Sequence, residues 1–276
     1  MGIPGTLLLE RYRVVRPIAF GASSVVYLAF DEYGGPFAVK LFPPSLASRA
    51  DREFLVGHGL NHPNLNPVIE RVTLEGQPGV LMPFAPGKRL SDAVHESGNR
   101  IFMQAFVQLL RALEAMHTKH MVHRDVKPEN LIVSPGENNS LEVKLIDYDL
   151  SGPDGEVFRE RVTPGTVAYL SPEAAQGLPL TPSSDLYSVG VLLFWGLTGQ
   201  LPFEGETRRE VMQAHIGSFP PVPRTLRPDW QEHPLDEVAL RLLEKDPKNR
   251  YPNVKAVLHE LECLPDHART LLPISG

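Results

Sequence analysis

Residues 123–130 read HRDVKPEN and lie between two apolar segments of the chain. This stretch offers a carboxylate at Asp125, an ammonium at Lys127 and an amide at Asn130. Phosphoryl transfer from a metal-bound nucleotide needs these groups close together: a base orients the attacking hydroxyl, a cation steadies the phosphoryl group and an amide oxygen binds metal. The HRD triplet alone recurs by chance, whereas the complete pattern is specific. It predicts a phosphoryl-transfer loop, against the alternative of a polar surface loop.

The composition narrows the class of protein. The chain has 276 residues, is 42% hydrophobic and carries a net charge of −6. That length suffices for a sizeable core, in one large domain or in two lobes. The net acidity argues against a nucleic-acid partner, which a basic patch would indicate. No run approaches the roughly 18 uninterrupted apolar residues of a membrane span, and residues 189–197 predict a buried core helix instead.

The single cysteine, Cys263, excludes an internal disulfide, so a reducing, cytoplasmic location is expected. Cys263 lies in the apolar run of residues 257–264, which predicts a buried structural thiol. A reactive thiol would need a histidine or a cation beside it, and the sequence shows no such arrangement.

Hydrophobic periodicity divides the chain into a β-rich first part and a helical second part. The first part predicts strands at 12–18, 25–30, 36–42, 66–73 and 79–84, and a helix over 45–58 with Ser45 as its N-cap. Gly34 and Gly35 predict a hairpin turn between the second and third strands. From Leu90 the apolar period becomes 3.6, which predicts a long helix over 102–116, and a β pair at 131–133 and 142–146 follows. We therefore expect a two-lobed α+β protein, joined near residues 82–87.

Lys40 ends an apolar strand segment, residues 37–40, and a buried ammonium needs a partner. On the predicted helix Glu53 shares one face with apolar and small residues at 46, 50, 57 and 60, so it faces the core. This pattern predicts a Lys40–Glu53 ion pair. The alternatives are an edge lysine that extends to water and a solvated glutamate.

Asp147 follows the buried strand at 142–146, where a carboxylate can bind a hard cation together with Asn130 and nucleotide phosphates. The alternative is a turn residue that ends a strand. Residues 18–26 read IAFGASSVV, and their small side chains around Gly21 let backbone amides approach phosphates. Taken alone, that loop is a weak signal.

Together these residues resemble the eukaryotic-like (Hanks-type) Ser/Thr protein kinases, over about residues 12–261. Bacterial members are similar at residues 165–173, GTVAYLSPE, and 184–190, SDLYSVG. The resemblance implies the two-lobed α+β kinase fold, a protein substrate, and ATP with Mg²⁺ or Mn²⁺ as cofactors. It also implies a kinase domain over 1–265, with an N-lobe at about 8–82, a hinge at about 83–87 and a C-lobe at about 88–265, followed by a tail over 266–276.

The resemblance implies a role for each motif residue. Asp125 is the catalytic base, Lys127 contacts the γ-phosphoryl group and favours Ser/Thr acceptors, Asn130 and Asp147 bind the metal, and Lys40 holds the α- and β-phosphates while pairing with Glu53. The nucleotide-binding set is Ile18, Gly21, Val26, Ala38, Lys40, Met82, Pro83, Ala85, Ile132 and Asp147. Three further contacts are implied: Thr166 with Asp125, Glu173 with Arg250, and Asp185 with the backbone of the catalytic loop.

The chain departs from the family pattern in three places. Ala19 and Ser24 replace two glycines of the phosphate loop, and residues 147–149 read DYD where the family has DFG. The tyrosine can pack where phenylalanine would if its hydroxyl finds a partner, and the second aspartate either recruits a cation or adds repulsion. Gly57 replaces an apolar side chain. It predicts a gap and a loosely held helix, with the tyrosine or a partner protein filling the gap, so Gly57→Leu is expected to raise basal activity.

Residues 147–173 form the predicted activation segment, and autophosphorylation is expected at Thr163, because Arg124 precedes the catalytic aspartate in an arrangement that receives a phosphate. Input is expected from a regulatory protein or from a homodimer formed through the N-lobe. Two alternatives to an active kinase stay open. A pseudokinase acting as a nucleotide-dependent binding or scaffolding module is favoured by Asp149 and the altered loop. A small-molecule kinase of the same fold is disfavoured by the substrate platform at 165–173.

Overall fold

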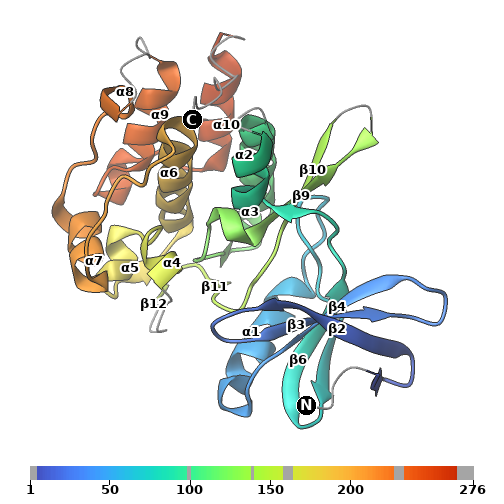
Figure 1. Ribbon diagram of the computed structural model, residues 1–276. Coiled ribbons are helices and arrows are strands. Elements are labelled where there is room, and N and C mark those ends of the chain that lie inside the picture. Colours follow the sequence, from blue (N-terminus) through green and yellow to red (C-terminus); the bar gives the residue numbers. More distant parts are fainter. Residues whose placement is uncertain (1–4, 98–100, 138–139, 158–163, 227–232, 266–276) are drawn as a thin grey trace.

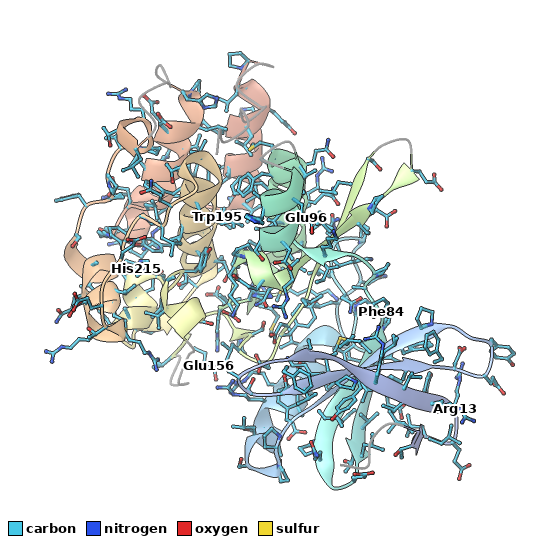
Figure 2. The ribbon with its side chains drawn as sticks, viewed as in Figure 1. Arg13, Phe84, Glu96, Glu156, Trp195 and His215 are labelled. Atoms are coloured by element: carbon cyan, nitrogen blue, oxygen red, sulfur yellow. The ribbon has the colours of Figure 1, made fainter. Side chains whose placement is uncertain are left out.

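The computed structural model describes residues 5–97, 101–137, 140–157, 164–226 and 233–265 (Figure 1). A sheet with one helix forms the N-terminal lobe, and helices dominate the C-terminal lobe (Figure 1). Phe84, the residue after the last strand of the sheet, lies where the two lobes meet (Figure 2). Within the described ranges, no helix is both long enough and apolar enough to cross a bilayer.

The N-terminal lobe is built on a six-stranded antiparallel sheet with strand order β1-β2-β3-β4-β6-β5. Its strands are β1 Leu7–Leu8, β2 Tyr12–Phe20, β3 Val25–Phe30, β4 Pro36–Leu41, β5 Glu70–Leu74 and β6 Gln77–Pro83. The predicted turn at Gly34 is confirmed, since this residue has φ 81°. The strand predicted from residue 66 begins only at residue 70, because the amide of Asn66 donates to the carbonyl of Leu145 in the other lobe at 3.1 Å.

Helix α1, Ala47–Gly57, packs against β6 and β5 and follows a 3₁₀ helix, η1, over Pro44–Leu46. The predicted N-cap at Ser45 is wrong: Ser45 lies inside η1, and Leu46 occupies the N-cap of α1 without a side-chain hydrogen bond. Pro44 occupies the first turn of η1 with its φ already set for a helix, so the turn starts before Ser45. The prediction that Glu53 faces the core is confirmed, because Glu53 is buried.

The C-terminal lobe is organised around helix α6, Pro182–Thr198, whose residues are nearly all buried, as the apolar run at 189–197 predicts. A capping box between Thr181 and Ser184 starts α6, and Gly199 ends it with φ 72°. Helix α6 packs on α3, Phe102–Thr118, and on α9, Pro234–Leu242. The other helical elements are α2 Leu90–Ser97, η3 Pro128–Asn130, α4 Pro164–Val167, α5 Pro172–Ala175, α7 Arg208–Gly217, α8 Pro223–Leu226, η5 Pro247–Asn249 and α10 Val254–Cys263.

Cys263, the last residue of α10, is exposed, so the predicted buried thiol is wrong. Val254, Val257 and Leu261 form the buried face of this helix, and the helical period turns Cys263 to the surface. Its Sγ atom lies 3.8 Å from Nε2 of His259, one turn earlier.

Short strands fix the loops at the junction of the lobes. The predicted β pair is confirmed as β9, Leu131–Pro135, and β10, Leu141–Leu145, with β7, Lys88–Arg89, beside β9. Strand β8, Met121–Val122, pairs with β11, Gly152–Pro153, and β12, Glu156–Val157, pairs with β13, Pro179–Leu180. Because β9 pairs with β10 and β8 with β11, the loop at 123–130 and the segment at 146–151 run side by side.

Candidate active site

A buried carboxylate on α6 binds the backbone of the loop at 123–130. Asp185 accepts hydrogen bonds from the backbone amides of His123 at 2.9 Å and Arg124 at 2.8 Å, so the predicted contact is confirmed. These bonds hold Arg124 in the left-handed region, with φ 68°, which costs a non-glycine residue about 1–2 kcal/mol. Burial alone would raise the pKa of Asp185, but its hydrogen bond from His117 and the positive charge there lower it below the ordinary value.

Three side chains meet around Asp125. The Thr166 hydroxyl donates to Oδ1 of Asp125 at 2.8 Å, which confirms that predicted contact. Nζ of Lys127 lies 2.7 Å from Oδ2 of Asp125 and 2.9 Å from the Thr166 hydroxyl. The Asn130 amide nitrogen donates to the backbone carbonyl and to Oδ2 of Asp125, at 2.8 and 3.0 Å. The carboxylate is thus fixed by three side chains, and the amide oxygen is the atom with which Asn130 can bind a cation.

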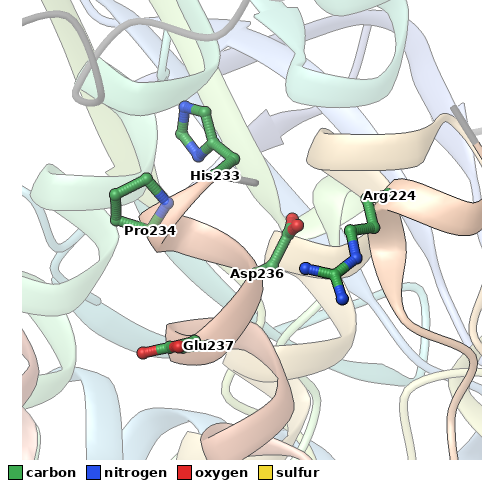
Figure 3. Close-up of a pocket in the computed structure, with 5 residues that line it drawn as sticks. All are labelled: Arg224, His233, Pro234, Asp236 and Glu237. Carbon is green, nitrogen blue, oxygen red and sulfur yellow. The ribbon is translucent and has the colours of Figure 1, made fainter. Parts of the chain in front are cut away.

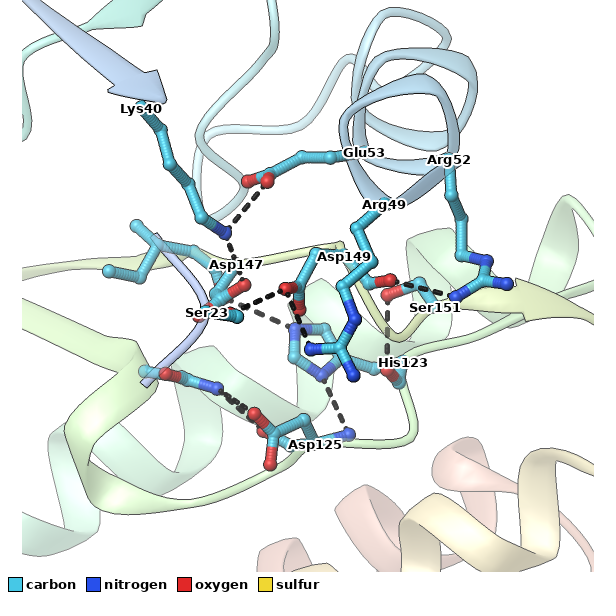
Figure 4. Close-up of polar contacts among 12 residues, drawn as sticks. Ser23, Lys40, Arg49, Arg52, Glu53, His123, Asp125, Asp147, Asp149 and Ser151 are labelled. Carbon is cyan, nitrogen blue, oxygen red and sulfur yellow. Dashed lines mark hydrogen bonds and ion pairs between the residues drawn. The ribbon is translucent and has the colours of Figure 1, made fainter. Parts of the chain in front are cut away.

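Lys40 on β4 makes two short ion pairs inside the protein (Figure 4). Its Nζ lies 2.7 Å from Oε2 of Glu53 on α1 and 2.7 Å from Oδ1 of Asp147. Burial would lower the pKa of Lys40, but the two carboxylates outweigh it and raise the pKa. Burial likewise opposes ionisation of Asp147, and the charge of Lys40 reverses this, so the pKa of Asp147 falls below its usual range. The predicted Lys40–Glu53 pair is confirmed, and Asp147 forms a second ion pair with the same lysine.

Asp147 and Asn130 are brought together by the backbone, because the amide of Ile146 donates to the carbonyl of Asn130 at 3.0 Å. Asp147 itself has φ 74°, a left-handed conformation that its side-chain contact with Lys40 holds in place. The described part of the chain contains no group of three or more His, Cys, Asp or Glu side chains that could hold a metal ion. One carboxylate and one amide oxygen suit Mg²⁺, which keeps several waters and takes further oxygens from a substrate's phosphates.

Tyr148 fills the space between α1 and the C-terminal lobe. It is 1% exposed; its hydroxyl donates to the carbonyl of Leu145 at 2.9 Å and accepts from the amide of Asn66 at 3.0 Å. The predicted requirement for a hydroxyl partner is therefore met. The space at Gly57 is filled, by Tyr148 as one of the two predicted alternatives has it and also by Val68, because a Cβ there would lie 2.3 Å from Cγ2 of Val68 and 3.0 Å from Cδ2 of Tyr148. Gly57 is where the chain needs a residue without a side chain.

Asp149, which stands where the family pattern has glycine, is buried and 4% exposed. Its Oδ2 atom lies 3.3 Å from the hydroxyl of Ser23 and 3.5 Å from Nη1 of Arg49 on α1 (Figure 4). Its backbone carbonyl accepts from Nη1 of Arg52 at 3.0 Å. Burial and the neighbouring charge of Asp147 raise the pKa of Asp149 to about 6.

The residues predicted to bind nucleotide come from both lobes. On the sheet, Val26 pairs with Lys40 and Ala38 pairs with Met82, and paired residues share a face, so these four side chains lie on one side of the sheet. The rest of the set is Ile18 on β2, Gly21 in the following turn, Pro83 at the end of β6, Ala85 in the connection to β7, Ile132 on β9 and Asp147 after β10. The structure thus brings most of the set to neighbouring strands.

The predicted activation segment is anchored at both ends. Arg124 donates to the carbonyl of Pro153 at 2.8 Å and pairs with Glu156 at 2.9 Å. Glu173 and Arg250 form the predicted pair, in a buried bidentate geometry at 2.8 and 2.9 Å. Thr163, the predicted phosphorylation site, lies outside the described residues.

Sequence reasoning missed several residues of this site. Asn66, besides its bond to Tyr148, donates from its side chain to the Pro83 carbonyl at 3.1 Å, and Ser23 and Arg49 contact Asp149. No spacing in the sequence signals these contacts, since the partners come from distant segments. A separate cavity of about 340 Å³ lies at α8 and α9 and is lined by Arg224, His233, Pro234, Asp236 and Glu237 (Figure 3). It contains none of the predicted site residues.

Comparison with known proteins agrees with this geometry. The family described as "Protein kinase domain" matches residues 12–261. The chain is 29% identical over 270 residues to the probable serine/threonine-protein kinase PknB of Lactococcus lactis, covering 93% of this chain and 42% of the relative. It is 31% identical over 289 residues to the serine/threonine-protein kinase pkn3 of Myxococcus xanthus (97% and 52%) and 32% identical over 262 residues to PknB of Mycobacterium tuberculosis (88% and 41%). The chain thus spans about half the length of these curated relatives.

Proposed function

Because this chain belongs to the protein kinase domain family, we propose that it transfers the γ-phosphoryl group of ATP to serine and threonine side chains of proteins. The observation that carries the proposal is the hydrogen-bonded group of Asp125, Lys127 and Thr166. A carboxylate held by three side chains can orient an incoming hydroxyl without rearranging first, and such positioning supplies most of the catalysis of phosphoryl transfer. Relatives named as serine/threonine-protein kinases support the choice of acceptor.

In this proposal Asp125 orients the acceptor hydroxyl and takes its proton. Lys127, 2.7 Å from that carboxylate, holds a positive charge where negative charge develops on the transferred group. Thr166 keeps the carboxylate in position from the activation segment. The three residues therefore act on the acceptor side of the site.

Lys40, Glu53 and Asp147 act on the nucleotide side in the same proposal. Glu53 holds Lys40 extended toward the α- and β-phosphates, and Asp147 with Asn130 would hold Mg²⁺. When bound, Mg²⁺ neutralises charge on the phosphates. The adenine would be bound by Ile18, Val26, Ala38, Met82, Pro83, Ala85 and Ile132, with Gly21 in the loop above the phosphates. The lobes would then meet at about residues 83–87, with the kinase domain ending near residue 265.

The proposal extends to regulation only in outline. Autophosphorylation in the activation segment, at Thr163, is part of it, because Arg124 precedes the catalytic aspartate and faces this segment through Pro153. The substrate is a protein, and a regulatory protein or a second copy of the chain acting through the N-lobe would supply the input.

The test compares the wild-type chain with Asp125→Asn. Both are incubated with labelled Mg-ATP and a generic basic protein, and phosphate incorporation is measured. We expect Asp125→Asn to lower the rate by about 10²–10⁴-fold, the range for loss of a general base. Asp154→Asn, an exposed carboxylate of the adjoining segment, is the control and should keep the wild-type rate.

Two results would separate this proposal from its alternative. Nucleotide binding by the wild-type chain without any transfer would point to a pseudokinase module. Equal transfer by Asp125→Asn and wild type would show that the assigned residue does not carry the reaction. Mass spectrometry after incubation with Mg-ATP tests phosphorylation at Thr163, and the absence of phosphate there would remove that part of the proposal.

A further inference from the structure

Three separate elements converge on Asp149. Ser23, in the loop between β2 and β3, lies 3.3 Å from Oδ2 of Asp149, and Arg49, on α1, lies 3.5 Å from the same atom. Arg52, one turn further along α1, donates to the backbone carbonyl of Asp149 at 3.0 Å. Asp149 lies in the segment at 146–151, two residues after Asp147. A single residue thus joins the loop, the helix and this segment (Figure 4).

A glycine at position 149 could make none of these side-chain contacts. The carboxyl group of Asp149 is buried, and a buried polar group is costly unless its partners are present. Removal of Ser23 or Arg49 therefore takes a partner from the buried carboxyl group of Asp149, and removal of Asp149 takes that contact from each of them. The side chain of Ser23 points from the loop toward Asp149 (Figure 4).

We propose that Asp149 is a positioning residue that ties the loop at residues 21–24 to helix α1 and thereby holds the loop over the nucleotide phosphates. The proposal rests on the proposed function, because it assigns the phosphates to that loop. Gly21 is the glycine that remains in this loop, where its amide donates to the carbonyl of Ser24 at 2.8 Å. The side-chain contact between Ser23 and Asp149 gives the loop a second anchor besides that backbone bond.

The test is a double-substitution cycle that measures nucleotide binding directly. Ser23→Ala removes the loop hydroxyl, Asp149→Ala removes its acceptor, and Ser23→Thr keeps a hydroxyl as the matched control. The dissociation constant of a non-hydrolysable ATP analogue with Mg²⁺ is measured by calorimetry, and KM for ATP and kcat are measured separately. We expect Ser23→Ala to raise the dissociation constant and KM about fivefold, the effect of one modest hydrogen bond, while kcat is little changed.

The cycle identifies the tie itself. In the Asp149→Ala background, Ser23→Ala should have no further effect, because its partner is already gone. Ser23→Thr, which keeps the hydroxyl, should bind the nucleotide analogue as tightly as the wild-type chain. Unchanged binding in Ser23→Ala, or an undiminished Ser23→Ala effect in the Asp149→Ala background, would overturn the proposal.

A second measurement does not depend on nucleotide. Hydrogen exchange at the amides of residues 21–24 should speed up in Ser23→Ala and in Asp149→Leu, a variant of similar shape without an acceptor oxygen that covers the case in which Asp149→Ala fails to fold. Unchanged exchange in both variants would also overturn the tie. If the wild-type chain binds no Mg-ATP while exchange responds as expected, the proposed function fails and the structural tie stands.

Discussion

Gly57 should not tolerate even a methyl group, in contrast to the expectation that a larger residue there raises activity. A Cβ at this position would lie 2.3 Å from Cγ2 of Val68, and Val68 cannot retreat freely. Its amide donates to the Gly57 carbonyl at 3.2 Å, its side chain is 2% exposed, and a β-branched residue is restricted in χ1. Gly57→Ala must therefore displace the end of α1 or the segment around Val68.

The magnitude follows from two opposing effects. Overpacking of a well-filled core costs about 1–3 kcal/mol. Replacing glycine by alanine in a helix interior gains about 1 kcal/mol, and less at the last residue of α1. We expect Gly57→Ala to lower the free energy of unfolding by about 1–2 kcal/mol. A displaced α1 would also move Glu53 away from Lys40, so phosphoryl transfer should fall.

Urea denaturation measures the free energy of unfolding of each variant. Phosphoryl transfer from labelled Mg-ATP is measured separately, on the folded protein. Gly59→Ala is the matched control, because the nearest atom to a Cβ there is 3.9 Å away. Val68→Ala in the Gly57→Ala background should recover stability and activity, since it removes the methyl group that collides. The reasoning is refuted if Gly57→Ala is as stable as Gly59→Ala, or if the effects of Gly57→Ala and Val68→Ala simply add.

Two further predictions concern the C-terminal lobe. His215 is buried on α7, and burial together with the charge of Lys245 lowers its pKa to about 4 (Figure 2). The unfolded chain then binds more protons between pH 6.5 and 4, so the folding stability due to His215, at most about 3 kcal/mol, is present above pH 6.5 and lost toward pH 4. Urea denaturation at several pH values should show a flatter dependence for His215→Gln but not for His95→Gln, an exposed control. Arg250→Leu should cost about 3–5 kcal/mol of unfolding free energy by stranding a buried carboxylate. Adding Glu173→Leu should recover part of that loss in thermal unfolding, and a double variant that is less stable than Arg250→Leu would contradict it.

The contacts that the sequence predicted correctly are those in which burial makes a partner obligatory. Lys40 ends an apolar strand and Glu53 lies on the apolar face of a helix, and each charge is too costly to bury alone. For Lys40 and Glu53, helical spacing together with the cost of burial was sufficient to predict the pair. The pair of Glu173 and Arg250 is also present in the structure, but the family resemblance implied it and the residues alone did not.

The errors arose where local chemistry depends on helix phase or on packing. Ser45 is a good N-cap type, yet the preceding prolines start a separate 3₁₀ turn around it. Cys263 lies in an apolar run, yet the phase of α10 exposes it. The absence of a side chain at Gly57 suggested a void. Whether a void exists there depends on how closely Val68 and Tyr148 approach α1, which the sequence does not report.

Asp149 shows a third kind of difficulty. Its partners lie 126 and 100 positions away, at Ser23 and Arg49, and both are residue types that usually face water. No periodicity connects them to the segment at 147–149. The structure gives this carboxylate specific side-chain partners at Ser23 and Arg49, and the rise of its pKa beside Asp147 agrees with the predicted alternative of repulsion.

The hydroxyl of Tyr148 has a consequence for inhibitor chemistry. The ring is buried, and its hydroxyl joins the carbonyl of Leu145 to the amide of Asn66. A drug-like compound that needs this ring to swing out must break both bonds, at about 0.5–1.5 kcal/mol for each, although the amide of Asn66 and the carbonyl of Leu145 keep their direct hydrogen bond. Compounds that leave Tyr148 in place avoid this cost, so a screen against this protein should favour scaffolds that occupy the nucleotide side of Lys40 alone.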